Sequence, residues 1–136
     1  MQNLTYKSEF IPEVLISIVL SDNPNYEKLE PIFKELGYGF MVPNQNLIII
    51  DGEQLINNFD SDVLKFIEAH EISHIIMGHD GPRSEDDELD ADLGAYILLT
   101  QSGKNDSVKT LLKNFKDRHG MRFSEDLLER VKKYFS

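Results

Sequence analysis

The hydrophobic positions in the first half of the chain predict two helices and a small sheet. Residues 11–20 are mostly apolar and too few to span a bilayer, and their pattern predicts a helix, with a strand as the alternative. Amphipathic spacing over residues 25–36 predicts a helix that Gly37 ends. Two β-prone runs follow, at residues 38–42 and 47–51, separated by a short segment containing Pro and Asn. This arrangement predicts an antiparallel hairpin.

The second half of the chain has the apolar spacing of helices. Asp60 or Ser61 is a suitable cap for a helix over residues 62–78, and a break containing Gly and Pro follows that helix. Three further helices are expected, over residues 85–101, 106–118 and 124–135. No internal repeat or linker composition divides the sequence. We therefore expect one domain (1–136) of mostly helical α+β class, with a small antiparallel sheet preceding the first of these helices.

That first helix contains an HExxH motif, His70-Glu71-Ile72-Ser73-His74. Residues four apart lie one above the other on a helix, so the imidazoles of His70 and His74 can bind one ion. Imidazole is a preferred ligand of zinc, and bound zinc lowers the pKa of water towards neutrality. Glu71 lies beside His70 and is placed to act as the general base for that water. The alternative is a pair of core histidines without a metal, because a short motif also arises by chance.

A catalytic zinc needs a third protein ligand, and three side chains after the motif are candidates. Asp80 has the spacing of the last metzincin ligand, but the glycine that this pattern requires three residues earlier is absent. His79 would need the helix to unwind, so we expect it to cap the helix C-terminus. Two helices joined by a short break pack antiparallel, which sets Glu88 level with the end of the motif and makes it the expected ligand. Asp92, one turn further on, is expected to accept a hydrogen bond from a ligand imidazole.

Charge and composition narrow the classes of function. The chain has 14 Lys and Arg against 24 Asp and Glu, a net charge of −10 and a pI near 4.7. This acidity argues against binding to nucleic acid or to an anionic membrane, since both require clustered cations. The sequence has no cysteine, which excludes disulfides and thiolate zinc sites and fits a reducing compartment such as the cytoplasm.

The acidic charge is concentrated around Glu88 and Asp92. Residues 80–92 alone have a net charge of −6, whereas residues 103–136 have a net charge of +4. These opposite charges raise the hypothesis that the basic tail lies over the acidic segment and keeps the protein latent.

The two motifs HEISH and ELDAD together resemble the gluzincin metallopeptidases, which combine HExxH with a later glutamate helix of the ExxAD type. The nearer likeness is to the ImmA/IrrE group, which is similar in the Gly-His pair after the motif and in the short preceding sheet. The resemblance covers about residues 38–100. It implies a zincin-like fold with zinc on the two motif histidines and Glu88, Glu71 as general base, and Asp92 in a supporting role.

The expected function is therefore a soluble, cytoplasmic zinc metalloendopeptidase acting on a protein or peptide. Such an enzyme also needs a donor to the oxyanion. Tyr96 is a candidate, and the tail offers Tyr134, His119 and Arg122 as alternatives, although a role in packing or on the surface is the favoured interpretation of each. The competing hypothesis is a non-catalytic or latent metal-binding interaction module on the same fold. An intact Glu71 favours the enzyme, because a purely structural site needs no base.

Overall fold

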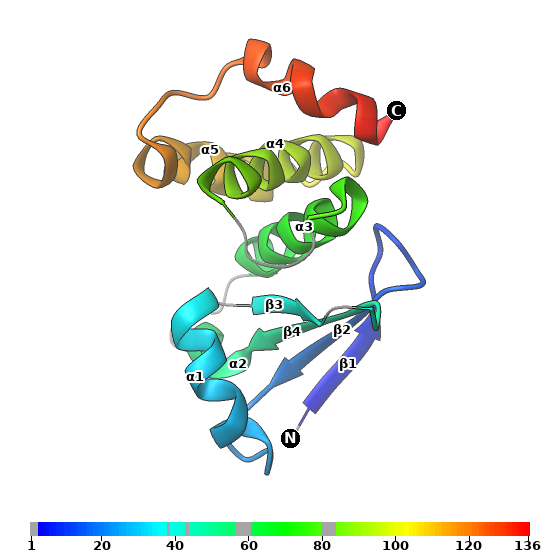
Figure 1. The fold of residues 1–136 in the computed structure, drawn as a ribbon, viewed down its shortest axis with the longest axis vertical. Coiled ribbons are helices and arrows are strands. Elements are labelled where there is room, and N and C mark those ends of the chain that lie inside the picture. Colours follow the sequence, from blue (N-terminus) through cyan, green and yellow to red (C-terminus); the bar gives the residue numbers. More distant parts are fainter. Residues whose placement is uncertain (1–2, 38, 43, 57–60, 80–83) are drawn as a thin grey trace. The chain divides into compact units, whose positions relative to one another are not determined.

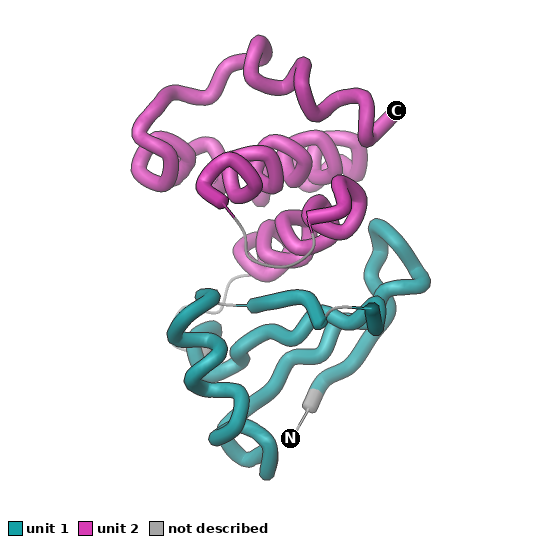
Figure 2. Tube along the Cα trace, viewed as in Figure 1, with its two compact units in different colours: residues 1–60 teal, residues 61–136 magenta. Residues whose placement is uncertain are grey.

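The computed structural model describes residues 3–37, 39–42, 44–56, 61–79 and 84–136. The chain divides into two compact units, Met1–Asp60 and Ser61–Ser136, coloured separately in Figure 2. The first unit contains the sheet and two helices, and the second unit is helical. The prediction of a mostly helical α+β protein is confirmed.

Four strands of the first unit form one sheet in the order β1-β2-β4-β3 (Figure 1). Their bounds are β1 (Asn3–Lys7), β2 (Leu15–Val19), β3 (Gly39–Val42) and β4 (Leu47–Asp51). β3 and β4 form the predicted antiparallel hairpin, and β1 pairs antiparallel with β2. β2 and β4 are parallel. The sheet is therefore mixed, rather than antiparallel as the sequence had suggested.

The helix expected over residues 11–20 is wrong, because this segment contains β2, and the parallel pairing of β2 explains the error. Ile16 of β2 lies opposite Ile48 of β4, and both side chains are fully buried. Strands in parallel sheets are continuous apolar runs, so they lack the alternation that marks a half-exposed strand. A parallel pair also needs a crossover, which α1 (Tyr26–Leu36) and β3 supply. Of the two interpretations, the strand is the correct one.

α1 is held to the sheet by aromatic packing and by one buried carboxylate. Phe33 of α1 packs on Phe40 of β3, with ring centroids 5.5 Å apart. The hydroxyl of Tyr26 donates a 3.0 Å hydrogen bond to Asp51, the last residue of β4. Asp51 also accepts a hydrogen bond from the backbone N–H of Glu53. This second bond starts α2 (Gly52–Ile56), a short helix that, like β1, was not predicted.

The second unit consists of the four predicted helices followed by a 3₁₀ turn. Their bounds are α3 (Ser61–Met77), α4 (Glu85–Gln101), α5 (Asn105–His119), α6 (Glu125–Lys132) and η1 (Lys133–Phe135). In Figure 1, α4 lies beside α3, and α5 and α6 pack against α4. The predicted cap Asp60 lies outside the described residues. Among the described residues, no helix combines the length and apolar character needed to cross a membrane.

Small residues bring α3 and α4 close together. Ala69 of α3 and Ala91 and Ala95 of α4 are fully buried. At Gly94 a side chain would collide with α3, because an added Cβ would lie 2.8 Å from Cβ of Ser73. α4 itself begins with a capping box in which Ser84 and Asp87 exchange hydrogen bonds. The capping box therefore sets where α4 begins, and the close packing at Gly94 sets its register against α3.

Candidate metal centre

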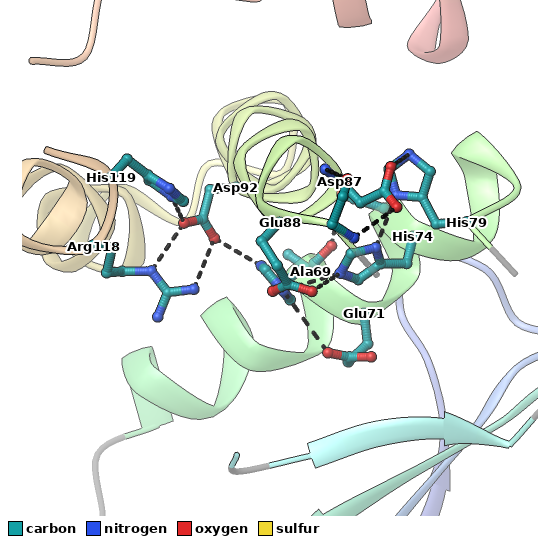
Figure 3. Close-up of polar contacts among 12 residues, drawn as sticks. Ala69, Glu71, His74, His79, Asp87, Glu88, Asp92, Arg118 and His119 are labelled. Carbon is teal, nitrogen blue, oxygen red and sulfur yellow. Dashed lines mark hydrogen bonds and ion pairs between the residues drawn. The ribbon is translucent and has the colours of Figure 1, made fainter. Parts of the chain in front are cut away.

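The two histidines of the motif and Glu88 direct their ligand atoms at a common point (Figure 3). Nε2 of His70 and Nε2 of His74 lie 3.2 Å apart, as the one-turn spacing on α3 predicted. The carboxylate of Glu88 comes from the first turn of α4. Its two oxygens lie 3.0 Å from Nε2 of His70 and 3.2 Å from Nε2 of His74. Two nitrogens and a carboxylate thus converge to within hydrogen-bonding distance of one another.

Glu71, which lies on α3 with the two histidines, is the fourth side chain at this point. One of its oxygens lies 3.9 Å from Nε2 of His70, and its side chain is buried. The ligand atoms of His70, Glu71 and His74 all lie within 4.8 Å of one another, so this trio could also hold a metal ion. Glu88 makes the closer contacts with both imidazoles. By these distances Glu88 is the nearer candidate ligand, and Glu71 lies beside the group.

The second ring nitrogen of each histidine also has a partner. Nδ1 of His70 lies 2.7 Å from Oδ1 of Asp92, which accepts its hydrogen bond. Nδ1 of His74 lies 2.9 Å from Nδ1 of His79. Such partners fix the orientation of an imidazole and the nitrogen it presents to a metal. Asp92 therefore stands where the sequence placed it.

His79 does more than the expected helix cap. Its backbone N–H donates to the carbonyl of His74 at 2.9 Å, which closes the end of α3. Its ring contacts His74 on one side, and on the other its Nε2 lies 3.6 Å from Asp87. The side chain thus links a candidate ligand to the cap of α4, a role that the sequence had not indicated. Asp80 lies outside the described residues.

Carboxylates around His70 stabilise positive charge on its ring. Burial alone would lower the pKa of His70, but hydrogen bonds to Asp92 and Glu88 outweigh it and raise this pKa to about 9. Partial burial would raise the pKa of Glu88, but hydrogen bonds from His70 and His74 hold it well below its usual range. The same groups that bind a proton here are suited to binding a metal cation.

Asp92 is held by the end of α5 as well as by His70. Burial would raise its pKa, but hydrogen bonds from His119 and His70 and the charge of Arg118 hold that pKa well below its usual range. Nε of Arg118 lies 2.9 Å from Oδ2 of Asp92, and Nε2 of His119 contacts the same oxygen. The sequence had suggested His119 only as an oxyanion donor and had not pointed to Arg118. Arg118 and Asp92 are 26 positions apart, and no local pattern indicates the contact.

The basic tail does contact the acidic segment, in the way its charge suggested. Arg118 pairs with Asp92, and Arg130 of α6 pairs with Asp90 at 2.6 Å. The tail helices also contribute buried side chains to the second unit, namely Leu111, Phe115, Leu128 and Val131. These residues make the tail part of the folded unit, whereas its role in latency stays a hypothesis.

Tyr96 lies in an aromatic cluster. Its ring packs on Phe123 with centroids 4.5 Å apart, and Phe123 in turn packs on Phe115 of α5. This contact supports the packing interpretation of Tyr96. Its role as an oxyanion donor remains a prediction.

No protein-family model matches the chain, and comparisons with curated proteins and with solved structures give no significant match. The gluzincin resemblance therefore depends on the residues of the two motifs and their arrangement.

Proposed function

We propose that this protein is a zinc-dependent metallopeptidase whose metal ligands are His70, His74 and Glu88. The observation that carries the proposal is the convergence of their ligand atoms, which lie 3.0–3.2 Å apart although they come from two helices. Ligands about 2.0–2.2 Å from a tetrahedral zinc are spaced roughly 3.3–3.6 Å apart. The spacing therefore fits the ion after a shift of a few tenths of an ångström.

The donor set also fits zinc chemically. Two imidazoles and one carboxylate form a common catalytic zinc set, which leaves a fourth position for water or substrate. When bound, zinc polarises the substrate carbonyl and lowers the pKa of water. Asp92 and His79 would keep Nε2 of each histidine directed at the ion.

Glu71 is the proposed general base. Its carboxylate lies next to the ligand group without making the short contacts of Glu88. In this position it would take a proton from the attacking water as the water oxygen bonds to the peptide carbon. It would then deliver that proton to the leaving nitrogen as the C–N bond breaks. Water is consumed, and its second proton passes from the new carboxyl group to the amine, so the products are a carboxylate and an ammonium group.

The substrate class follows from the family resemblance, because the arrangement supports hydrolysis without specifying what is hydrolysed. We propose a protein or peptide substrate. A cytoplasmic location, and the absence of nucleic-acid and membrane partners, remain predictions from composition.

A second candidate function is a metal-binding module without catalysis. The observation in its favour is burial: His74 is fully buried, and His70 is 7% exposed. Closed, buried coordination is typical of metal sites that serve structure. The two candidates share the ligands and differ in whether Glu71 has a chemical role.

Metal analysis and peptide cleavage on the same samples test the proposal. We expect one zinc per chain in the wild type and in Glu71→Gln, with cleavage of an unstructured protein substrate by the wild type alone. Glu129→Gln on the exposed face of α6 is the matched control and should retain both properties. Zinc in both proteins with cleavage in neither would favour the metal-binding module. A wild type that binds no zinc would overturn both candidates.

A further inference from the structure

We propose that Arg118 and His119, the last residues of α5, are positioning residues for the metal ligand His70 and act on it through Asp92. The inference rests on the proposed function, because it takes His70 as a ligand. It adds a third helix, α5, to a site whose other members lie on α3, on α4 or, for His79, just after α3.

The contacts leave Asp92 no freedom to turn (Figure 3). Oδ1 faces Nδ1 of His70 at 2.7 Å and Nη2 of Arg118 at 3.4 Å. Oδ2 accepts from Nε of Arg118 at 2.9 Å and also contacts Nε2 of His119. Both oxygens are therefore held from α5, and one of them orients the imidazole. A carboxylate without these donors could rotate about its Cβ–Cγ bond and release His70.

Arg118 and His119 are themselves held by aromatic rings. The guanidinium of Arg118 lies over the ring of Phe66, 5.3 Å from its centroid. Phe66 is one turn before His70 on α3, and their rings are 6.1 Å apart. The ring of His119 packs on Phe115, with centroids 4.8 Å apart. The end of α5 thus has a defined position against both helices that carry ligands.

Charge gives a second reason why Asp92 needs α5. Its carboxylate is 1% exposed, and a buried carboxylate is costly unless charged or hydrogen-bonding partners compensate. Arg118 supplies a full positive charge in a fork that matches the carboxylate. Partners of ligand histidines typically change metal affinity by about 10–100-fold when they are removed. We expect residues that hold such a partner to have an effect at the lower end of this range.

The chain offers a matched control in Arg130. This arginine also reaches α4 from a tail helix, and it pairs with Asp90 at 2.6 Å. Its side chain is 47% exposed, close to the 40% of Arg118. Replacing Arg130 removes the same kind of ion pair without touching Asp92. It therefore separates the effect on the metal site from the loss of one cation between the tail and α4.

The experiment measures zinc affinity of the full chain by competition with a chelator, together with thermal unfolding of the metal-free protein. Arg118→Met keeps the aliphatic stem over Phe66, and His119→Phe keeps the ring on Phe115. We expect each to weaken zinc binding about tenfold, whereas Arg130→Met stays within about twofold of the wild type. Arg118→Lys restores the charge without the fork and should recover part of the affinity. The unfolding curves show whether each variant is folded before metal is added.

A double-mutant cycle tests whether Arg118 acts through Asp92. In an Asp92→Asn background, Arg118→Met should change zinc affinity by less than about twofold, because the partner through which it acts is already altered. A tenfold loss in both backgrounds would overturn the inference, as would wild-type affinity in Arg118→Met and His119→Phe.

The experiments distinguish failure of this inference from failure of the proposed function. A wild type that binds zinc but cleaves no peptide removes the proposed catalysis, while an affinity loss in the α5 variants would still support their positioning role. A wild type that binds no zinc overturns both. Normal zinc binding by every α5 variant overturns this inference alone.

Discussion

Nδ1 of His74 and Nδ1 of His79 lie 2.9 Å apart, so one of the two rings must donate and the other accept. If His74 presents Nε2 to a metal, its Nδ1 carries the proton and His79 accepts. His79 then carries its own proton on Nε2, which faces Asp87 at 3.6 Å. The contact therefore predicts a chain from ligand to imidazole to carboxylate, parallel to the contact of His70 with Asp92.

Replacing His79 tests this chain. His79→Phe keeps an aromatic ring at the end of α3 but removes the acceptor, and we expect zinc affinity to fall about tenfold. Asp87→Asn should have a smaller effect, because it contacts His79 at longer range. Zinc titration by calorimetry measures both. Unchanged affinity in His79→Phe would show that His74 needs no partner at Nδ1.

Glu88 and Glu71 are distinguished by which of them is needed to retain zinc. Glu88→Ala should reduce bound zinc from one per chain to well below one, because a zinc site with two protein ligands is weak. Glu85→Ala, an exposed position in the same first turn of α4, is the control and should keep the metal. Zinc content of dialysed protein gives the answer. Loss of zinc in Glu71→Gln with retention in Glu88→Ala would reverse the two roles.

The helices and the motif were predictable because their signals are local. The 3.6-residue period places His70 and His74 on one face whatever the rest of the chain does. α4 has Ser84 before it as a cap and Ser102-Gly103 after it, so its bounds agree with those expected. Glu88 followed from the short connection between two antiparallel helices. None of these inferences needs information about distant residues.

The features that sequence analysis missed depend on contacts between distant residues. β2 is a short apolar run. Such a run fits a helix and a buried strand equally well until its parallel partner, here β4, is known. In the sequence, nothing distinguishes Arg118 from the other cations of the basic tail. Its pairing with Asp92 depends on how α5 packs against α4, which the pattern of either helix leaves open. The candidate ligands were therefore easier to predict from the sequence than the residues that contact and hold them.

Gly94 provides a test of the close packing between α3 and α4. Alanine is favoured over glycine in a helix by about 1 kcal/mol, so Gly94→Ala would be stabilising if the position were open. An added Cβ would instead lie 2.8 Å from Cβ of Ser73 and 2.5 Å from Cζ of Phe135. We expect a net loss of about 1–3 kcal/mol in the free energy of unfolding, measured with urea. Thr100→Ala, an exposed position on the same helix, should not destabilise the protein. A more stable Gly94→Ala would contradict the close packing.

Tyr26 predicts a pH dependence of stability in the first unit. Burial and the hydrogen bond to Asp51 raise the pKa of Tyr26 to about 12, above the 10.0 of an ordinary tyrosine. A raised pKa in the folded state means that the stabilising contribution is complete below pH 10 and is lost as the pH rises through about 12. Tyr26→Phe should therefore cost about 1 kcal/mol at pH 8, and this difference from the wild type should shrink at pH 11. Urea unfolding at the two pH values measures the difference. Tyr134→Phe, at a position 46% exposed, is the control and should leave stability unchanged at pH 8. A Tyr26→Phe difference that is the same at both pH values would show that the hydroxyl ionises equally easily in the folded and unfolded chain.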